Sequence, residues 1–102
     1  MAKKYRDPRE FMVSLKKQVN IKTIQYREIA DNQKAFEFEF KGAKFTLVLI
    51  KYSFDDYYGY YELLLGSYAS NVQMGDLRDL TATKRLTVDN VVKHLRLQAR
   101  YF

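Results

Sequence analysis

The chain has 102 residues, of which 47% are hydrophobic and none is cysteine, and it carries a formal net charge of +6. This length suits a single domain over residues 1–102, and the apolar content predicts a folded chain with a modest core. The lack of cysteine excludes disulfides, thiolate chemistry and cysteine-ligated zinc, and it favours a reducing compartment.

The first predicted element is a helix that begins after Asp7. The Asp7 carboxylate can cap the helix, and Pro8 suits the first helical position. Apolar residues then recur at helical spacing, and the helix is expected to end near Asn20. Residues 21–30 fit either a strand or a continuation of the helix, and their alternation favours a strand. The apolar stripe of the helix consists of Phe11, Met12, Leu15 and Val19.

Residues 36–49 contain the clearest pattern in the chain, in which aromatic and aliphatic residues alternate with polar ones on two successive strands. Residues 42–43 between them predict a two-residue type II′ turn, because glycine then occupies its first central position. That turn places Lys41 opposite Lys44 and directs the phenylalanines and leucines of both strands to one buried face.

The opposite face of this hairpin is mixed, because Val48 and Ile50 are apolar whereas Glu37, Glu39 and Thr46 are polar. A strand that is apolar on both faces is usually covered on both. Either another part of the chain or a partner is therefore expected to cover Val48 and Ile50, and a homodimer through this face is one possibility.

Residues 53–59 are predicted to form the loop that leads into the fourth strand, and they crowd tyrosines, carboxylates and one glycine together. Such loops are typical of protein-binding surfaces, because each ring gives a large contact area at a low entropy cost. Neighbouring strand residues point to opposite faces, so these rings cannot all be buried. We expect an outward-facing acidic site for a protein partner, formed by Asp55, Asp56, Tyr57, Tyr58, Tyr60 and Glu62.

The remaining elements complete an α+β fold. A fourth strand is predicted over residues 60–68, a turn at 73–76 and a short helical turn at 77–80. A last helix begins after Thr87, which can cap it, and its apolar stripe extends to Phe102. The predicted architecture is a four-stranded antiparallel sheet flanked by an N-terminal and a C-terminal helix, in the order α-β-β-β-β-α.

Charge is distributed unevenly along the chain. Residues 1–30 hold eight Lys/Arg against three Asp/Glu, residues 31–83 hold five against eight, and residues 84–102 hold five against one. If the two helices pack side by side, their cations form one positive surface that attracts phosphates, although solubility alone is an equally good explanation. The residues of this predicted basic surface are Lys84, Arg85, Lys93, Arg96, Arg100, Lys16 and Lys17.

Catalytic chemistry finds little support. His94 is the only histidine and is interpreted as a partly exposed helix residue without a catalytic role. Paired carboxylates, either Asp55 and Asp56 with Glu62 or Glu37 with Glu39, are better explained as turn residues and an outward strand face than as ligands of a divalent ion. No nucleotide-binding motif is present. We therefore expect no catalytic residue, no metal and no cofactor.

These observations favour a small non-enzymatic interaction protein. No secretory leader is recognisable, and the longest apolar run, residues 47–50, is too short to span a bilayer, so a cytoplasmic location is expected. A short chain of this kind resembles, in general character, the accessory proteins of phages and mobile elements, including anti-CRISPR inhibitors. The resemblance implies a nucleic-acid-handling protein partner whose loading would be sterically blocked.

Two alternatives remain open at this point. The first is direct binding of single-stranded DNA or RNA through the basic helices and exposed tyrosines. The second is a small metal-dependent nuclease, which ranks last because only isolated carboxylate pairs support it.

Overall fold

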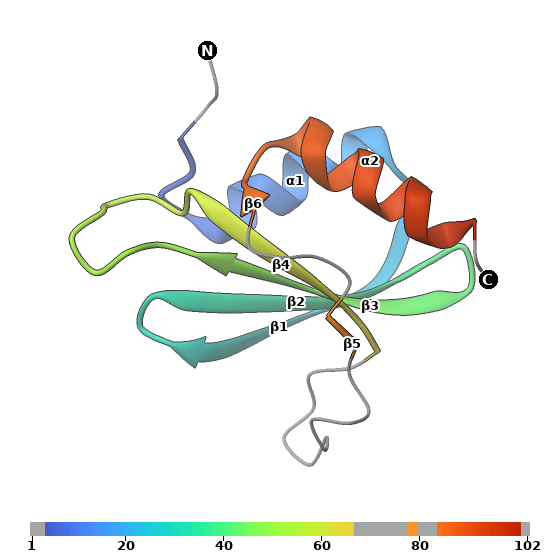
Figure 1. Ribbon diagram of the computed structural model, residues 1–102, viewed down its shortest axis with the longest axis horizontal. Helices are drawn as coiled ribbons and strands as arrows, with labels where there is room; N and C mark the ends of the chain where they lie inside the picture. The colour runs from blue at the N-terminus through green and yellow to red at the C-terminus, as the bar shows by residue number, and fades with distance from the viewer. Residues whose placement is uncertain (1–3, 67–77, 80–83, 101–102) are drawn as a thin grey trace.

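A computed structural model describes residues 4–66, 78–79 and 84–100 and shows a two-layer α+β fold, with both helices on one face of an antiparallel sheet (Figure 1). The sheet order is β1-β2-β3-β4-β5, and β6 also pairs with β4. The predicted fold class is confirmed, with two short strands added at the sheet edge. The elements are α1 (Pro8–Gln18), β1 (Ile21–Ala30), β2 (Gln33–Phe40), β3 (Ala43–Ile50), β4 (Tyr60–Leu65), β5 (Arg78–Asp79), β6 (Lys84–Arg85) and α2 (Val88–Ala99).

Both helices begin at the predicted caps. The Asp7 carboxylate accepts a hydrogen bond from the Arg9 backbone N–H at 2.9 Å, and the Thr87 hydroxyl accepts one from the Asn90 N–H at 3.0 Å. Each cap satisfies a backbone donor that has no partner within the helix. The last residue of the predicted C-terminal stripe, Phe102, lies outside the described residues. No helix in the described ranges is both long and apolar enough to cross a bilayer.

Residues 21–30 form strand β1, as favoured by their alternation. The strand is irregular, because its register with β2 shifts between Lys22 and Gln25, where Thr23 has a positive φ of 56°. Such a bulge bends an edge strand and interrupts the row of unpaired backbone groups that it would otherwise present to another chain.

The β2–β3 hairpin forms with a register that differs from the predicted one by two residues. The two central turn residues are Lys41 and Gly42, both at positive φ, as a type I′ turn requires. Lys44 therefore pairs with Glu39 and not with Lys41. An even shift keeps every side chain on its predicted face, and the observed register replaces a repulsive lysine pair by an attractive one.

The main core lies between the sheet and the helices. It joins the α1 stripe, the alternating phenylalanines and leucines of the central strands, and the inner face of α2 around Val91 and Leu95. Because α1 and α2 share this face, they pack against each other and cover it together (Figure 1). The core explains why the N-terminal and C-terminal elements, distant in sequence, end as neighbours.

The opposite face of the sheet carries a smaller buried cluster of Ala35, Val48 and Leu64. Val48 is only 3% exposed and Ile50 is half-buried, so Val48 is a core residue that offers almost no surface to a second copy. Glu37 is also buried on this face, contrary to its interpretation as an outward strand residue, and its Oε2 lies 3.1 Å from Arg27 Nε. An ion pair accommodates the buried charge.

The region after β4 differs from the expectation where it is described. Arg78 and Asp79 form strand β5 opposite Leu65 and Leu64, and not part of a helical turn. Backbone pairing with the free edge of β4 outweighs the local preference of such a short segment, which cannot nucleate a helix alone. The turn predicted at 73–76 and the end of the strand predicted over 60–68 lie outside the described residues.

Candidate functional site

A hollow of about 470 Å³ lies between α2 and the sheet edge formed by β4 and β6. Asn90, Lys93, His94 and Leu97 follow one another at helical spacings of three, one and three residues, so they share the face of α2 that borders it. This face adjoins the buried stripe of the helix. We call this feature the α2 hollow, and its described lining residues are Tyr61, Lys84, Arg85, Asn90, Lys93, His94 and Leu97.

The floor of the α2 hollow is a buried polar pair. Tyr61 is 0% exposed, and its hydroxyl donates to the Asn90 carbonyl at 3.4 Å and lies 3.3 Å from His94 Nδ1. His94 is itself only 9% exposed, so it is buried and not partly exposed as expected. Burial raises the pKa of the Tyr61 hydroxyl, which keeps it protonated and able to donate. The contact fixes the orientation of the imidazole ring.

Strand β6 is anchored to its neighbours by backbone contacts. Arg85 pairs with Tyr60 and Lys84 with Tyr61, and the Asn90 side-chain amide donates to the Arg85 carbonyl at 3.0 Å. These contacts tie the start of α2 to the sheet edge. The backbone of Lys84 and Arg85 is therefore held in place, and both side chains are exposed to solvent.

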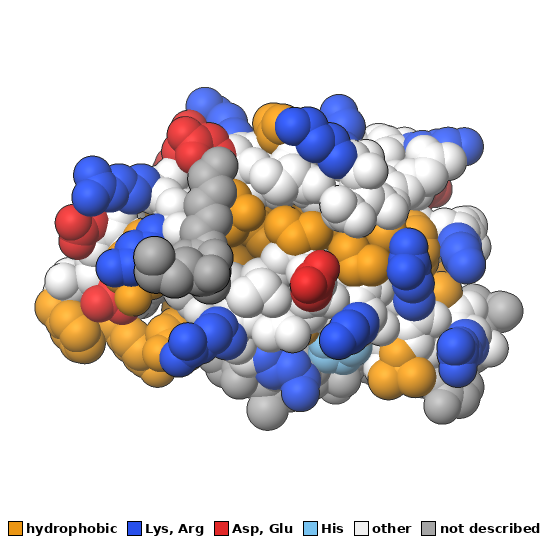
Figure 2. All heavy atoms as spheres, turned by 90° about the horizontal axis from the view of Figure 1, so that it is seen from above, with side chains coloured by type: hydrophobic (Ala, Val, Ile, Leu, Met, Phe, Trp, Pro, Cys, Tyr) orange, Lys and Arg blue, Asp and Glu red, His pale blue; other side chains and the backbone are white. Residues whose placement is uncertain are grey.

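The charge of the α2 hollow is one-sided. Lys84, Arg85 and Lys93 are exposed, and no carboxylate is found among the described residues that line the hollow. Within the described part of the chain, none of the three forms an ion pair. Figure 2 shows Lys and Arg side chains beside the single histidine on this face. Uncompensated cations around a concavity create a positive potential that attracts anions.

An aromatic cluster lies at the loop between β3 and β4. Phe54 is 83% exposed and stacks on Tyr52, with ring centroids 5.8 Å apart and planes within 10°. Tyr52 also contacts Tyr60, at 5.0 Å between centroids. We call these three residues the aromatic ridge; apolar side chains gather at this end of the molecule in Figure 2. Tyr60 is the cross-strand partner of Arg85 at the β4–β6 edge, and alternation along β4 turns its side chain to the sheet face opposite that of Tyr61.

The loop tyrosines are divided between core and surface. Tyr58 is 4% exposed, because its N–H donates to the Tyr5 carbonyl at 2.8 Å and draws the residue into the core. Tyr57 and Tyr60 are half-buried. The predicted contact residue Tyr58 is thus not available to a partner. Among the described aromatic residues, those classed as exposed are Phe54 and Tyr52, which sequence reasoning did not select.

Cations accompany the carboxylates of this loop. Asp56 lies 3.9 Å from Arg6 at the surface, Lys4 Nζ lies 4.8 Å from the centre of the Tyr57 ring, and Lys51 contacts Tyr58. Asp55 and Glu62 are half-buried. Because the N-terminal segment brings its cations to the loop, the expected acidic site is electrostatically mixed. The local field therefore does not exclude a phosphate-bearing ligand.

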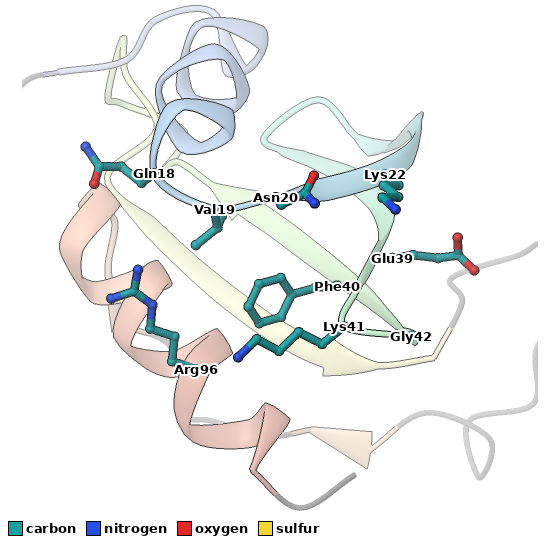
Figure 3. Close-up of a pocket in the computed structure, with 9 residues that line it drawn as sticks. All are labelled: Gln18, Val19, Asn20, Lys22, Glu39, Phe40, Lys41, Gly42 and Arg96. Carbon is teal, nitrogen blue, oxygen red and sulfur yellow. The ribbon is translucent and has the colours of Figure 1, made fainter.

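A second concavity of about 520 Å³, the end groove, lies where α1 passes into β1, across from the C-terminal half of α2 (Figure 3). Figure 3 shows the Phe40 ring at its centre, with Lys41 and Arg96 beside it and Glu39 pointing away. Glu39 instead accepts a hydrogen bond from Thr23. The described lining residues are Gln18, Val19, Asn20, Lys22, Glu39, Phe40, Lys41, Gly42 and Arg96.

The predicted basic surface is distributed over these two concavities. Lys84, Arg85 and Lys93 border the α2 hollow, and Arg96 borders the end groove. Lys16 and Lys17 are exposed in the last turn of α1, which ends at the groove, and Arg100 is exposed just beyond α2. The helices do pack on one sheet face, and their cations follow the exposed side of this layer (Figure 2).

The described residues contain no cluster of three or more His, Asp or Glu side chains able to hold a metal ion. The suggested carboxylate pair Glu37 and Glu39 is separated, since Glu37 is buried against Arg27 and Glu39 is exposed. Comparison with known proteins gives no match to a protein-family model, a curated protein or a solved structure.

Proposed function

We propose that this protein binds single-stranded nucleic acid without catalysing a reaction. The observation that carries the proposal is the α2 hollow, in which Lys84, Arg85 and Lys93 surround a concavity whose described lining contains no carboxylate. Phosphate contacts by Lys and Arg supply most of the affinity of non-specific nucleic-acid binding. Unpaired cations around a hollow are the feature that such contacts require.

The aromatic ridge favours a single strand over a duplex. Unpaired bases stack on exposed rings, and each such contact contributes about 1–3 kcal/mol. Phe54 offers its outer face, and Tyr52 supports the inner face at 10° from parallel. Since Tyr60 pairs with Arg85, a strand that stacks on the ridge can bring a phosphate to Arg85 at the sheet edge.

Further cations lie toward the C-terminal end of α2. Arg96 lies one helical turn beyond Lys93 on α2 and borders the end groove together with Lys22 and Lys41. A strand that runs from the ridge along α2 would therefore meet cations at both of its ends. Electrostatic contacts of this type predict binding that tolerates different sequences and weakens steeply with salt.

The test is fluorescence anisotropy with short labelled single strands of DNA and RNA, measured at about 50 mM and about 200 mM salt. Binding at low salt that weakens at high salt supports the proposal. Lys93→Ala should weaken binding, whereas Lys44→Ala removes a cation from the sheet face opposite the helices and should leave it unchanged. Absence of binding by the unmodified protein at low salt would refute the proposal.

A second candidate is docking onto a nucleic-acid-handling protein through the aromatic ridge, the mode of small inhibitors of host nucleases. The 83% exposure of Phe54 favours it, because large exposed rings act as anchors at protein interfaces. Comparing the single variants Phe54→Ser and Lys93→Ala distinguishes the two candidate functions. A partner captured by the unmodified protein and by Lys93→Ala but lost with Phe54→Ser would favour protein docking.

A further inference from the structure

We infer that the end groove is a second anion site, separate from the α2 hollow, which binds one phosphate group between Lys41 and Arg96. The inference does not depend on binding of nucleic acid in the hollow, because the phosphate can belong to a strand or to a small phosphorylated compound. It follows from the placement of the two cations, from the position of Glu39, and from backbone strain beside the groove.

The centre of the end groove is an apolar surface with two cations beside it. The Phe40 ring forms that centre and is 4% exposed. Lys41 Nζ lies 5.6 Å from the centre of the ring, and Arg96 approaches from α2 (Figure 3). Within the described part of the chain, neither cation forms an ion pair. Cations from two different elements that flank one hollow attract an anion into the space between them.

The carboxylate that borders the groove does not neutralise these two cations. Glu39 precedes Phe40 on β2, so alternation along the strand turns it to the opposite face of the sheet. There it accepts a hydrogen bond from Thr23 Oγ1 at 3.2 Å and lies across from Lys22. The charge of Lys22 is thereby matched by Glu39, which leaves the two cations beside the ring unmatched.

Backbone strain is concentrated beside the groove. Among the described non-glycine residues, positive φ angles occur at Thr23 (56°) and Lys41 (51°). For a β-branched residue such as threonine this conformation is an outlier, and outliers of this kind cluster at ligand sites. Thr23 lies in the β1 bulge, where its hydroxyl donates to Glu39. The strained bulge therefore helps to hold the carboxylate away from the groove.

The lysine at position 41 is the most specific of these observations. A type I′ turn places both central residues at positive φ, and asparagine followed by glycine meets this demand with the least strain. Lys41 occupies the position that favours asparagine, and Gly42 satisfies the other. Its contact with Phe40 is close to the outer limit of a cation–π interaction, so it offsets little of the cost. The charge that Lys41 brings to the groove explains a residue that is unfavourable for the turn.

The arrangement favours phosphate over carboxylate. The oxygens of a phosphate point in tetrahedral directions, so they can accept hydrogen bonds from donors on different elements. The Arg96 guanidinium suits bidentate contact with two of these oxygens, and Lys41 supplies a point charge to another. A carboxylate has only two oxygens, and a bidentate arginine contact uses both of them.

The C-terminal end of α1 opens onto the groove and opposes anion binding only weakly. The carbonyls at a helix C-terminus act as about half a negative charge. Lys16 and Lys17 lie in the last turn of the same helix and more than offset this charge. The surroundings of the groove therefore remain positive.

The test is a nuclear magnetic resonance titration of the isotopically labelled protein with inorganic phosphate, with chloride used to keep the ionic strength constant. Amide shifts at residues 41–42 and around Arg96 should saturate, with a dissociation constant on the order of 1–10 mM. Acetate at the same concentrations should give much smaller shifts. Shifts that do not saturate with phosphate, or equal saturation with acetate, would overturn the inference.

Matched variants separate a binding role from a structural one. Lys41→Asn should raise the melting temperature by roughly 2–5 °C, because it relieves the turn, and should weaken phosphate binding about tenfold. Lys41→Arg should retain binding. Arg96→Gln should lose binding without loss of stability, since the residue is exposed and glutamine suits a helix. Lys44→Ala removes a cation from the outer face of the same hairpin and should leave binding intact. Undiminished binding in Lys41→Asn or Arg96→Gln, or a lower melting temperature for Lys41→Asn, would contradict the inference.

A second titration, with a short single-stranded oligonucleotide at low salt, identifies the source of the phosphate. Shifts at the same amides would assign it to a nucleic-acid strand. If inorganic phosphate binds in the groove and the oligonucleotide binds nowhere, the proposed function fails and this inference stands, with a small phosphorylated compound as the ligand. If the oligonucleotide binds at the α2 hollow and inorganic phosphate leaves the end groove unshifted, this inference fails and the proposed function stands.

Discussion

Replacing Tyr61 by phenylalanine tests how the floor of the α2 hollow is built. The substitution keeps the buried ring and removes only the hydroxyl, which lies 3.4 Å from the Asn90 carbonyl and 3.3 Å from His94 Nδ1. Both contacts are longer than an average hydroxyl hydrogen bond, so together they contribute about 1 kcal/mol to the free energy of unfolding. The melting temperature should fall by roughly 4–6 °C at neutral pH.

The raised pKa of Tyr61 determines how the stability difference between the unmodified protein and the Tyr61→Phe variant depends on pH. In the unfolded chain the hydroxyl ionises near its ordinary pKa of 10.0, whereas burial delays ionisation in the folded protein. The folded state then holds the proton more tightly, so this stabilisation is complete below pH 10 and is lost as the pH rises through the folded pKa. Phenylalanine has no such group. The stability gap between the two proteins should therefore narrow above pH 10.

Urea denaturation followed by circular dichroism from neutral pH to about pH 11 measures this gap. Asn90→Ala, which also removes the amide contact to Arg85, is a useful comparison, because it weakens the same corner and leaves the Tyr61 ionisation in place. A gap between the Tyr61→Phe variant and the unmodified protein that stays constant across this range would refute the account of the floor.

Three further predictions concern surface cations, an exposed ring and a helix cap. Lys84→Ala combined with Lys93→Ala should reduce the slope of log K against log salt by about 1.4 for single strands, with Lys44→Ala leaving the slope unchanged; an unaltered slope in the double variant would place the phosphate contacts elsewhere. Phe54→Ser should weaken nucleic-acid binding by about 1–3 kcal/mol in an anisotropy titration and shift stability by no more than about 0.5 kcal/mol, because the ring is exposed; unchanged affinity would remove the ridge from the interface. Asp7→Ala should cost about 1 kcal/mol in urea denaturation through loss of the α1 cap, and a cost near zero would contradict the capping role.

The secondary structure was largely predictable, because its signals are local and repeated. Caps, helical stripes and strand alternation all indicated elements that the structure contains. The register of the β2–β3 hairpin was not predictable from the pattern. A shift of two residues leaves every side chain on the same face, so alternation does not distinguish the two registers. Lysine rarely adopts a positive φ, which made Gly42 the expected first turn residue, yet Lys41 takes that position and Lys44 gains Glu39 as its partner.

The candidate site was only partly predictable, because it depends on contacts between distant segments. The basic residues of β6 and α2 were identified from charge, but their convergence on a hollow depends on β6 pairing with β4. Residues 51–59 have no periodicity from which to decide which ring is buried. Tyr58 enters the core through its backbone contact with Tyr5, and the packing of His94 over Tyr61 likewise joins distant parts of the chain.

The most direct test of the central claim is a nuclear magnetic resonance titration of the isotopically labelled protein with an unlabelled single-stranded oligonucleotide. The account predicts progressive amide shifts in β6, on the face of α2 that carries Lys93 and His94, and around Phe54. Shifts confined to the opposite sheet face around Lys44, or no shifts at low salt, would contradict it.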